Sequence, residues 1–345
     1  MYNMEIGIKS VQALNDRLSE PAEALIGDME KIDGDILILG VGGKMGPSLA
    51  HLAVRARKET GIKGKIIGVS RFSKESTRQE MEQLGIKTIS GDLLNDEFLF
   101  NLPEAKNIIF MTGNKFGTTG NEPYTWATNA YLPGRVAQKF KHSRIVVFSS
   151  GNIYPLVSKE SGGATEMLNP GPVGEYAQSC LGRERVFDYF SHVNGTPILF
   201  FRLNYALDLR YGVLHEIAKA VWEDRPIDLT MGYVNVIWQG DANEYALRSL
   251  LHCTSPVKIL NVTGPEISSV KWLAEQFGQK MSKTPQFINT PEPNALLNNA
   301  GQAFELFGKP KVSLEQMIDW TADWLKSGGE ELGKATHFQE RKGVF

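Results

Sequence analysis

Short apolar runs alternate along the chain with stretches in which apolar residues return every three or four positions. The runs stay apolar throughout, as is typical of strands buried on both faces of a parallel sheet. The stretches between them have the spacing of amphipathic helices. The expected strands lie at 36–39, 65–69, 87–90, 107–111, 144–148 and 197–201, and the expected helices at 47–60, 75–84, 122–140 and 174–193. This order predicts an α/β fold with a doubly wound parallel sheet.

The pattern changes after about residue 205, where the pieces become shorter. Helical pieces near 213–223, 241–252, 267–278 and 313–326 alternate with short strands near 234–238 and 258–262. We expect an N-terminal helical extension at 1–34 and a main domain at 35–205, to which a strand near 234–241 returns. Residues 206–330 should form mainly a smaller α/β lobe that binds the substrate, and residues 331–345 a C-terminal tail.

Composition narrows the function classes. The chain has 345 residues, of which 42% are apolar and 22% charged, so it can bury a sizeable core in about two domains. A net charge of -2 gives no electrostatic support for binding nucleic acid or an anionic membrane. No apolar run reaches the roughly 18 residues of a membrane helix, and no signal peptide is apparent. Cys180 and Cys253 form neither a disulfide framework nor a metal motif, so we expect a cytoplasmic protein without a metal.

The segment 35–50 combines a strand, a glycine-rich turn and a helix start. The glycines of the turn stand three residues apart, at Gly40, Gly43 and Gly46. Glycine is needed there because a side chain would keep a diphosphate away from the backbone. The helix start adds free N–H groups and the positive end of its dipole, which suit an anion. We predict a dinucleotide site of the Rossmann type, to which Lys44 and Met45 also contribute.

Residues directly after the strands are further candidates, because ligands bind beyond the carboxyl ends of such a sheet. Ser70 and Arg71 stand where an acidic residue would bind the ribose hydroxyls of NAD. A hydroxyl and a cation fit the 2′-phosphate of NADP better, so we expect NADP in preference to NAD, unless Arg71 is only a solvated surface arginine. Asp92 either binds the adenine amino group or caps a helix. Other expected cofactor contacts are Leu93, Thr112, Gly113 and Lys115.

A serine and a tyrosine near the fifth strand could share one substrate oxygen. Ser150 ends the run after 144–148, and Tyr176 begins the helix that follows. The serine would polarise the oxygen, and the tyrosine would pass a proton if a nearby cation lowered its pKa from about 10. Lys115 is a candidate for that cation, although a plain surface lysine is a comparable interpretation.

In this order, the glycine loop, Ser149-Ser150 with Tyr154, and Tyr176 resemble the extended short-chain dehydrogenase/reductase family, of the NAD-dependent epimerase/dehydratase type. The resemblance covers roughly residues 35–328. It implies that Tyr176 is the general acid/base, that Ser150 orients the substrate oxygen, and that Asn129 supports a relay water or the active-site backbone. It also implies a homodimer through the helices at 122–140 and 174–193. The expected substrate contacts are Ser150, Asn152, Asn204, Tyr205 and Trp238.

Two positions depart from the family pattern. The family keeps a lysine four residues after the tyrosine, where it holds the nicotinamide ribose and lowers the tyrosine pKa, but this chain has Cys180. A neutral thiol cannot supply that charge, so we expect Lys115 to supply it. Arg183 shares the helix face but lies about 10 Å further along the axis. An arginine typical of the nucleotide-sugar enzymes is replaced by Val234, which weakens the expectation of a nucleotide-diphosphate sugar.

The sequence therefore predicts an NAD(P)-dependent oxidoreductase, epimerase or dehydratase that acts on a hydroxyl or carbonyl of a sugar-like small molecule. The three reactions share these residues, so the motifs do not separate them. The alternative is a catalytically weak dinucleotide-binding protein that acts as a redox sensor or regulator.

Overall fold

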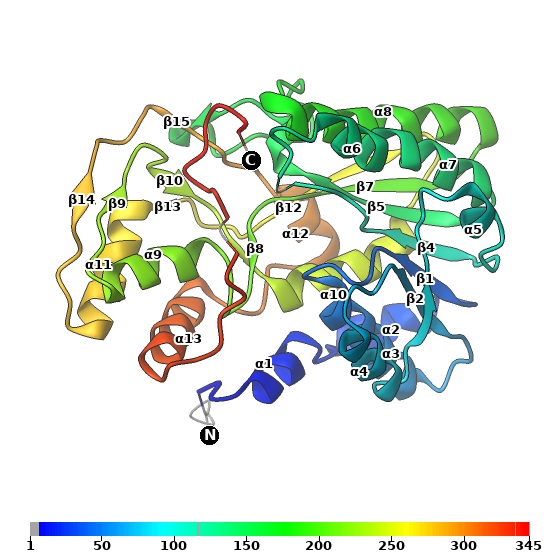
Figure 1. The fold of residues 1–345 in the computed structure, drawn as a ribbon, viewed down its shortest axis with the longest axis horizontal. Helices are drawn as coiled ribbons and strands as arrows, with labels where there is room; N and C mark the ends of the chain where they lie inside the picture. Colours follow the sequence, from blue (N-terminus) through cyan, green and yellow to red (C-terminus); the bar gives the residue numbers. More distant parts are fainter. Residues whose placement is uncertain (1–6, 116, 335, 345) are drawn as a thin grey trace.

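The larger lobe is built on a seven-stranded parallel sheet (Figure 1). The structure is a computed structural model that describes residues 7–115, 117–334 and 336–344. The strand order is β12-β7-β5-β4-β1-β2-β3, and every pairing is parallel. The strands are β1 (Ile36–Leu39), β2 (Ile66–Ser70), β3 (Lys87–Ser90), β4 (Asn107–Phe110), β5 (Arg144–Ser150), β7 (Ile198–Leu203) and β12 (Lys258–Val262). All the expected strands of the main domain are present within two residues at each end, which confirms the doubly wound sheet.

Helices cover both faces of the sheet, which explains its uniformly apolar strands. Ile36 and Ile38 of β1 face one hydrophobic cluster, whereas Leu37 and Leu39 face another, and all four side chains are fully buried. The first cluster includes side chains of α2 (Glu23–Met29), α3 (Gly46–Thr60), α4 (Glu75–Gln83), α10 (Gln239–Arg248) and α12 (Gly301–Phe307). The second includes side chains of α5 (Asp96–Phe100), α7 (Leu132–Lys139) and α8 (Gly174–Asn194).

The expected helix at 122–140 contains a change of helical type. It begins as α6 (Glu122–Trp126), continues as the π-helical segment η1 (Ala127–Tyr131) and ends as α7. A π-helical turn widens the backbone locally and often occurs at functional sites. Here it carries Asn129, one of the expected site residues.

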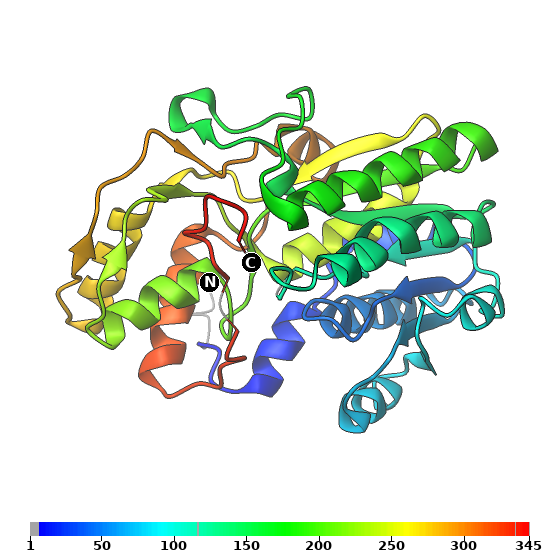
Figure 2. The same ribbon diagram turned by 45° about the horizontal axis from the view of Figure 1, so that its top comes forward.

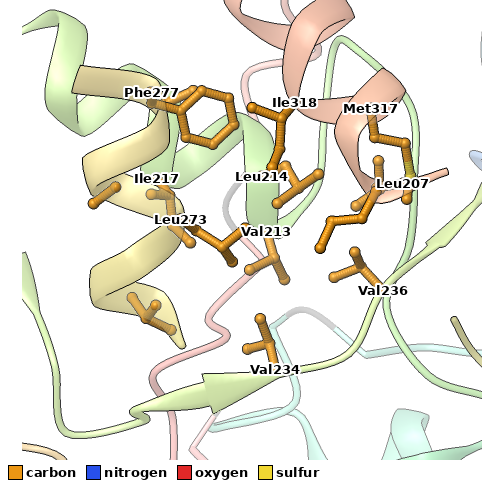
Figure 3. Close-up of a cluster of buried hydrophobic side chains, with 14 of the residues drawn as sticks. Leu207, Val213, Leu214, Ile217, Val234, Val236, Leu273, Phe277, Met317 and Ile318 are labelled. Carbon is orange, nitrogen blue, oxygen red and sulfur yellow. The ribbon is translucent and has the colours of Figure 1, made fainter. Parts of the chain in front are cut away.

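The smaller lobe packs three helices around its own hydrophobic core (Figure 3). These are α9 (Val213–Trp222), α11 (Val270–Met281) and α13 (Leu314–Lys326). Leu214 and Ile217 of α9 meet Leu273 and Phe277 of α11 and Ile318 of α13 in this core. Short paired strands edge the lobe: β8 (Ala206–Leu207) with β11 (Ile237–Trp238), β9 (Ile227–Asp228) with β14 (Phe287–Ile288), β10 (Tyr233–Val234) with β13 (Ser268–Ser269), and β6 (Val157–Ser158) with β15 (Asn294–Ala295).

One expectation about the sheet is corrected. The strand that returns to the main sheet is β12, at 258–262, whereas residues 234–241 contribute β10, β11 and the start of α10. Leu260 and Val262 are fully buried beside β7, as an edge strand covered by helices requires. The two-residue strands β10 and β11 are too short to add to a buried parallel sheet.

The N-terminal helices join the two lobes and do not form a separate extension. They are two helices, α1 (Val11–Leu18) and α2, on either side of Pro21. Leu14 and Leu18 belong to the core of the smaller lobe, whereas Leu25 and Met29 belong to the core beside the sheet. Residues 1–6 of this expected segment lie outside the described residues.

The C-terminal tail crosses between the two lobes (Figures 1 and 2). We call residues 331–334 and 336–344 the strap. Leu332 donates its backbone N–H to Arg210, and Arg341 donates to the carbonyl of Asn294 at 2.7 Å. The Phe338 side chain is buried in the core of the smaller lobe. The strap is therefore a packed part of the fold.

In the described part of the chain, no helix is long and apolar enough to cross a membrane.

Candidate active site

Two adjoining cavities lie along the carboxyl ends of the sheet strands. The outer groove, of about 810 Å³, runs past the ends of β1, β2, β3 and β4. The inner pocket, of about 320 Å³, lies between the ends of β4, β5 and β7, the start of α8 and the smaller lobe. Gly40, Gly43, Met111 and Gly113 line both cavities, so the two form one continuous site. This is the edge of a doubly wound sheet where ligands bind.

The three glycines of the loop are required for different structural reasons. A β-carbon on Gly46 would come within 2.0 Å of the Val41 carbonyl oxygen, so glycine is required for α3 to start where it does. Gly40 has a φ of +88°, and a β-carbon there would press on Thr112. A β-carbon on Gly43 would meet only the Gly40 carbonyl, at 3.4 Å, and would otherwise extend into the cavities. Gly43 therefore leaves space for a ligand, whereas Gly46 serves the packing.

The outer groove offers hydrogen-bonding groups that the protein itself does not satisfy. The hydroxyls of Thr112 and Thr128 are buried and have no hydrogen-bond partner among the described residues. Both threonines line this groove. Buried hydroxyls without partners are costly, so such groups indicate a polar ligand. Together with the open face of Gly43, they fit a dinucleotide.

The expected residues for the adenosine end gather in the same groove. Ser70, Arg71, Asp92 and Leu93 all line it. The carboxylate of Asp92 accepts the backbone N–H of Leu94 at 3.0 Å and does not cap α5, whose N-cap is Asn95. The helix-cap interpretation of Asp92 is therefore wrong. Lys74 and Lys334, which sequence reasoning did not select, add two cations to this groove.

Ser150 and Tyr176 meet at the wall of the inner pocket. The side chains of Ser150 and Cys180 lie close enough to the Tyr176 hydroxyl to influence its pKa. Ser150 also accepts the backbone N–H of Asn152 at 3.1 Å and donates to its amide oxygen. Burial raises the pKa of Tyr176 well above its ordinary value, whereas Ser150 and the positive charge of Arg183 act against this rise. Tyr176 is therefore a neutral proton donor.

Two cations approach this pair from different elements. The Lys115 ammonium nitrogen lies 5.7 Å from the centroid of the Tyr176 ring. Burial lowers the pKa of Lys115 to about 8. Arg183 is buried, and it donates to the carbonyl of Phe148 at 2.6 Å and to the Asn129 side chain at 3.0 Å. Burial raises the pKa of Cys180, with Arg183 and Lys115 acting in the opposite direction. Cys180 is thus a neutral, fully buried thiol.

Asn129 is fully buried and holds the loop that follows β4. Its amide oxygen accepts the Asn114 backbone N–H at 2.8 Å, and its amide nitrogen donates to the Asn114 carbonyl at 2.9 Å and to the Ser179 hydroxyl at 2.9 Å. The amide oxygen also accepts from Arg183. These bonds occupy both ends of the side chain. Of the two expected roles for Asn129, the geometry supports bracing of the active-site backbone.

Most expected substrate contacts lie in the inner pocket, but one does not. Asn152, Asn204 and Tyr205 line it. Trp238 is 1% exposed and packs edge-on against Trp320 in the core of the smaller lobe, with ring centroids 5.4 Å apart. The expectation for Trp238 is corrected, because a fully buried indole cannot contact a substrate in this pocket.

Arg202, two residues before Asn204, does not line the cavity either. It forms a buried ion pair with Glu184 at 2.7 Å and donates to the Tyr154 hydroxyl at 2.5 Å. Glu184 in turn accepts from the Ser149 hydroxyl at 2.5 Å. This network ties β5, α8 and β7 together behind Ser150, and it fixes the strand end that carries that residue.

Sequence reasoning missed several residues of the inner pocket. Tyr211, Gly212, Val213 and Thr336 line it, and Glu216 anchors Thr336 through its side chain. These residues belong to the smaller lobe and the strap, where no motif marks them. The sequence places Lys44 only at the cofactor, yet its ammonium nitrogen lies 3.2 Å from the centroid of the Tyr211 ring. Among the described residues, no group of His, Cys, Asp and Glu side chains is arranged to hold a metal ion.

Comparison with known proteins locates this architecture among solved structures. No protein-family model matches the sequence, and a search of curated proteins gives no match. A UDP-glucuronic acid 4-epimerase from Bacillus cereus, solved with a fluorinated UDP-sugar and NAD, superimposes with a TM-score of 0.70 at 17% identity over 85% of this chain and 99% of that one. The chain has the fold of these epimerases. UDP-glucose 4-epimerase from Thermus thermophilus, in complex with NAD, gives 0.67 at 16% identity over 85% and 99%.

The epimerase fold extends to a third organism and over most of the chain. An epimerase from Methanothermobacter thermautotrophicus gives a TM-score of 0.70 at 16% identity, over 89% of this chain and 96% of that one. Almost the whole length of each relative is therefore matched, smaller lobe included. The fold that the sequence resemblance implied is confirmed.

Proposed function

We propose that this protein is an NAD(P)-dependent enzyme that acts on a hydroxyl or carbonyl group of a sugar-like small molecule. The observation that carries the proposal is that Ser150 and Tyr176 line the same pocket, which continues into the glycine-loop groove. The shared fold supports it, because the similar epimerases from Bacillus cereus and Thermus thermophilus were solved with NAD. Epimerase, dehydratase and dehydrogenase reactions all remain within this class.

The outer groove would hold the adenosine and diphosphate part of the cofactor. Gly40, Gly43 and the start of α3 would face the diphosphate, and Thr112 and Thr128 would donate hydrogen bonds. When bound, the nicotinamide supplies or accepts a hydride. Gly113 lines both cavities, and a β-carbon there would come within 2.7 Å of the Arg183 guanidinium.

Ser150, Tyr176 and Lys115 would then transfer a proton to or from the reacting oxygen. Ser150 would donate a hydrogen bond to the reacting oxygen, and the Tyr176 hydroxyl would give a proton to that oxygen or remove one from it. Removal requires the tyrosinate, which burial disfavours here. Lys115 would stabilise the tyrosinate from the loop after β4, with Arg183 contributing from behind.

For the cofactor we propose NADP in preference to NAD. Arg71 and Lys74 line the adenosine end of the groove beside Ser70, and the residue directly after β2 is Arg71, not a carboxylate. A 2′-phosphate would be attracted by these cations, whereas a carboxylate at this place would repel it. The test is the ratio of the NADPH and NADH dissociation constants before and after Arg71→Ala. We expect the ratio to shift towards NADH by about tenfold or more, and an unchanged ratio would contradict the proposal.

The turnover experiment separates the enzyme from a cofactor-binding sensor. Purified protein with NADP+ or NAD+ is mixed with sugars, sugar acids, sugar phosphates and nucleotide sugars, and products are followed by absorbance and chromatography. We expect turnover that falls about 10²–10⁴-fold in Tyr176→Phe. Tight cofactor binding without turnover of any of these compounds would favour the sensor, which Cys180 in place of the lysine makes the second candidate.

We further propose a homodimer through α6, η1 and α8. Tyr131, Tyr189 and Val193 expose 56%, 62% and 60% of their surface on these helices. Large exposed apolar side chains on neighbouring helices fit an interface. Light scattering after size-exclusion chromatography should give twice the 38.3 kDa mass of one chain, and Tyr189→Asp should shift the protein to the monomer.

For the localisation we propose the cytoplasm, because the free thiols of Cys180 and Cys253 fit a reducing compartment. Fluorescence imaging of the protein in cells would test this.

A further inference from the structure

The inner pocket contains a cation that its surroundings do not neutralise. Lys44 starts from the glycine loop, but its ammonium ends above the Tyr211 ring in the smaller lobe. Among the described residues, no carboxylate lies within the 4 Å of an ion pair with the Lys44 ammonium. The ammonium contacts the Tyr211 ring instead. A cation–π contact replaces only part of the lost hydration of an ammonium. Lys44 therefore holds a positive charge towards the part of the pocket formed by the smaller lobe.

The carboxylates nearest to Lys44 are bound to other groups. Asp208 accepts two hydrogen bonds from the Arg210 guanidinium, at 2.8 and 3.3 Å, and one from its backbone. Glu216 accepts from the hydroxyl of Thr336 at 2.7 Å and also from its backbone N–H. Both acids act on Lys44 only from a distance, and each already has a close partner.

A second lysine enters the same pocket from the loop after β4. Lys115 lines the inner pocket together with Lys44. Burial, with a smaller contribution from repulsion by Lys115, lowers the pKa of Lys44 to about 7. Two lysines in one small pocket destabilise the fold unless a negative charge comes between them. An anion in the pocket would offset this cost.

The cofactor diphosphate is the competing explanation for Lys44, and the contacts of the side chain argue against it. Lys44 lines the inner pocket but not the outer groove, whose expected adenosine end is lined by Ser70, Arg71 and Asp92. The ring above which it ends, Tyr211, belongs to the smaller lobe, which carries the substrate side of the pocket. The ammonium is therefore directed towards the smaller lobe.

The size of the pocket limits what can carry the anion. Its volume of about 320 Å³ is at the low end of small-molecule sites. Tyr205, Tyr211 and Thr336 line its side towards the smaller lobe, and Lys115 donates to the Thr336 carbonyl at 3.4 Å. With the reactive end of a cofactor inside, the remaining space suits a molecule of monosaccharide size.

We propose that the inner pocket binds a small sugar-like molecule that carries an anionic group, a carboxylate or a phosphate, through Lys44 with Lys115 beside it. The word substrate applies to this molecule only if the proposed function holds, but its binding can be measured without turnover. The proposal names the chemical class that the pocket selects and separates it from neutral sugars.

Calorimetry on full-length Tyr176→Phe protein saturated with NADP+ tests the proposal. The probes are matched pairs: glucuronate and glucose, galacturonate and galactose, glucose 6-phosphate and glucose. We expect the anionic member of at least one pair to bind about tenfold tighter or more, and the pair concerned distinguishes a carboxylate from a phosphate. Lys44→Met should abolish this preference and leave the dissociation constant of NADP+ unchanged. Lys63→Met removes an exposed lysine outside both cavities and should retain the preference.

Three results would overturn the proposal. They are equal binding of charged and neutral members, no binding of any anionic probe at millimolar concentration, and a Lys44→Met variant that loses NADP+ instead of the sugar acid. Failure of the proposed function looks different, since sugar acids would then bind to the wild-type protein without any hydride transfer. Turnover of neutral sugars with equal efficiency would leave the proposed function standing and remove this inference.

Discussion

The Lys115 ammonium lies 5.7 Å from the centre of the Tyr176 ring, whereas the residue one helical turn after Tyr176 is the buried thiol of Cys180. The positive charge that the family pattern places on the tyrosine's own helix thus approaches from another element, the loop after β4. That loop is held by Asn129 through both polar atoms of its amide. The position of the lysine depends on the loop, and the loop depends on the π-helical segment.

Replacing Lys115 should slow the reaction and change its pH dependence. In Lys115→Met, kcat/KM should fall by about 10²-fold or more, because no ammonium stabilises the tyrosinate. In the oxidative direction the rate rises with pH as Tyr176 loses its proton, so this rise should move to higher pH. Rates measured from neutral to alkaline pH test this. Lys115→Arg should recover part of the rate, and an unchanged profile in Lys115→Met would exclude the role.

Cys180 should not react with alkylating reagents and should take no part in the reaction. Burial raises its thiol pKa and leaves none of its surface exposed. Iodoacetamide at neutral pH should leave it unmodified in the folded protein, as mass spectrometry of the peptides would show. Cys180→Ala should keep the rate within about threefold, since no step of the proposed chemistry uses the thiol. Rapid alkylation with loss of activity would show that the thiol takes part.

Two glycine substitutions should separate binding from folding. Gly46→Ala places a β-carbon within 2.0 Å of the Val41 carbonyl and should lower the unfolding temperature strongly or prevent folding. Gly43→Ala meets nothing closer than 3.4 Å and should fold normally. Its methyl group extends into the cofactor groove, so affinity for NADP+ should fall by about tenfold or more. Thermal unfolding and calorimetry on the same two proteins make the comparison.

Binding of a sugar acid should weaken as the pH rises above neutrality. The Lys44 pKa of about 7 and the Lys115 pKa of about 8 mean that both ammonium groups lose their protons between about pH 6 and 9. The other groups that act on Lys44 are Asp208, Glu216 and Lys334, and the Tyr211 ring covers it. Calorimetry across this range should show tighter binding at the acid end, and binding that strengthens with pH would contradict the assignment.

The same lysine should reduce stability. Because the folded protein holds the Lys44 pKa below its unfolded value of 10.5, the unfolded chain binds more protons between about pH 7 and 10.5, and the cost is present in full below that range. Lys44→Met removes it, so this variant should unfold at a higher temperature than the wild type near neutral pH. A stabilised protein that has lost its preference for acids would show that function maintains the charge.

The sheet and the cofactor loop are predictable because their signals are local. A run such as Ile36–Leu39 must be apolar on both sides when helices cover both faces of its sheet, and three spaced glycines leave few other interpretations. The edge strand β12 matches the short strand expected near 258–262, which the sequence pattern assigns to the smaller lobe. Its partner β7 lies 60 residues earlier at matching positions, such as Leu260 opposite Phe201, and nothing local in the sequence indicates that pairing.

The far wall of the pocket is not predictable from motifs. Tyr211 and Thr336 reach it through the fold of the smaller lobe and the path of the strap, which depend on long-range packing such as the burial of Phe338. The prediction for Trp238 fails for the same reason. A tryptophan close to the site in sequence turns into the core, where Trp320 provides an aromatic partner.

The inner pocket brings together residues from Gly40 to Thr336, roughly 300 positions apart in the sequence. No single segment can form the pocket, so a ligand that fills it binds only the fully assembled chain. Such a ligand draws the folding equilibrium of both lobes towards the native state in proportion to its occupancy. Melting curves recorded against a library of sugar acids would therefore report binding even while the reaction is undefined, and could identify the substrate before an activity assay exists.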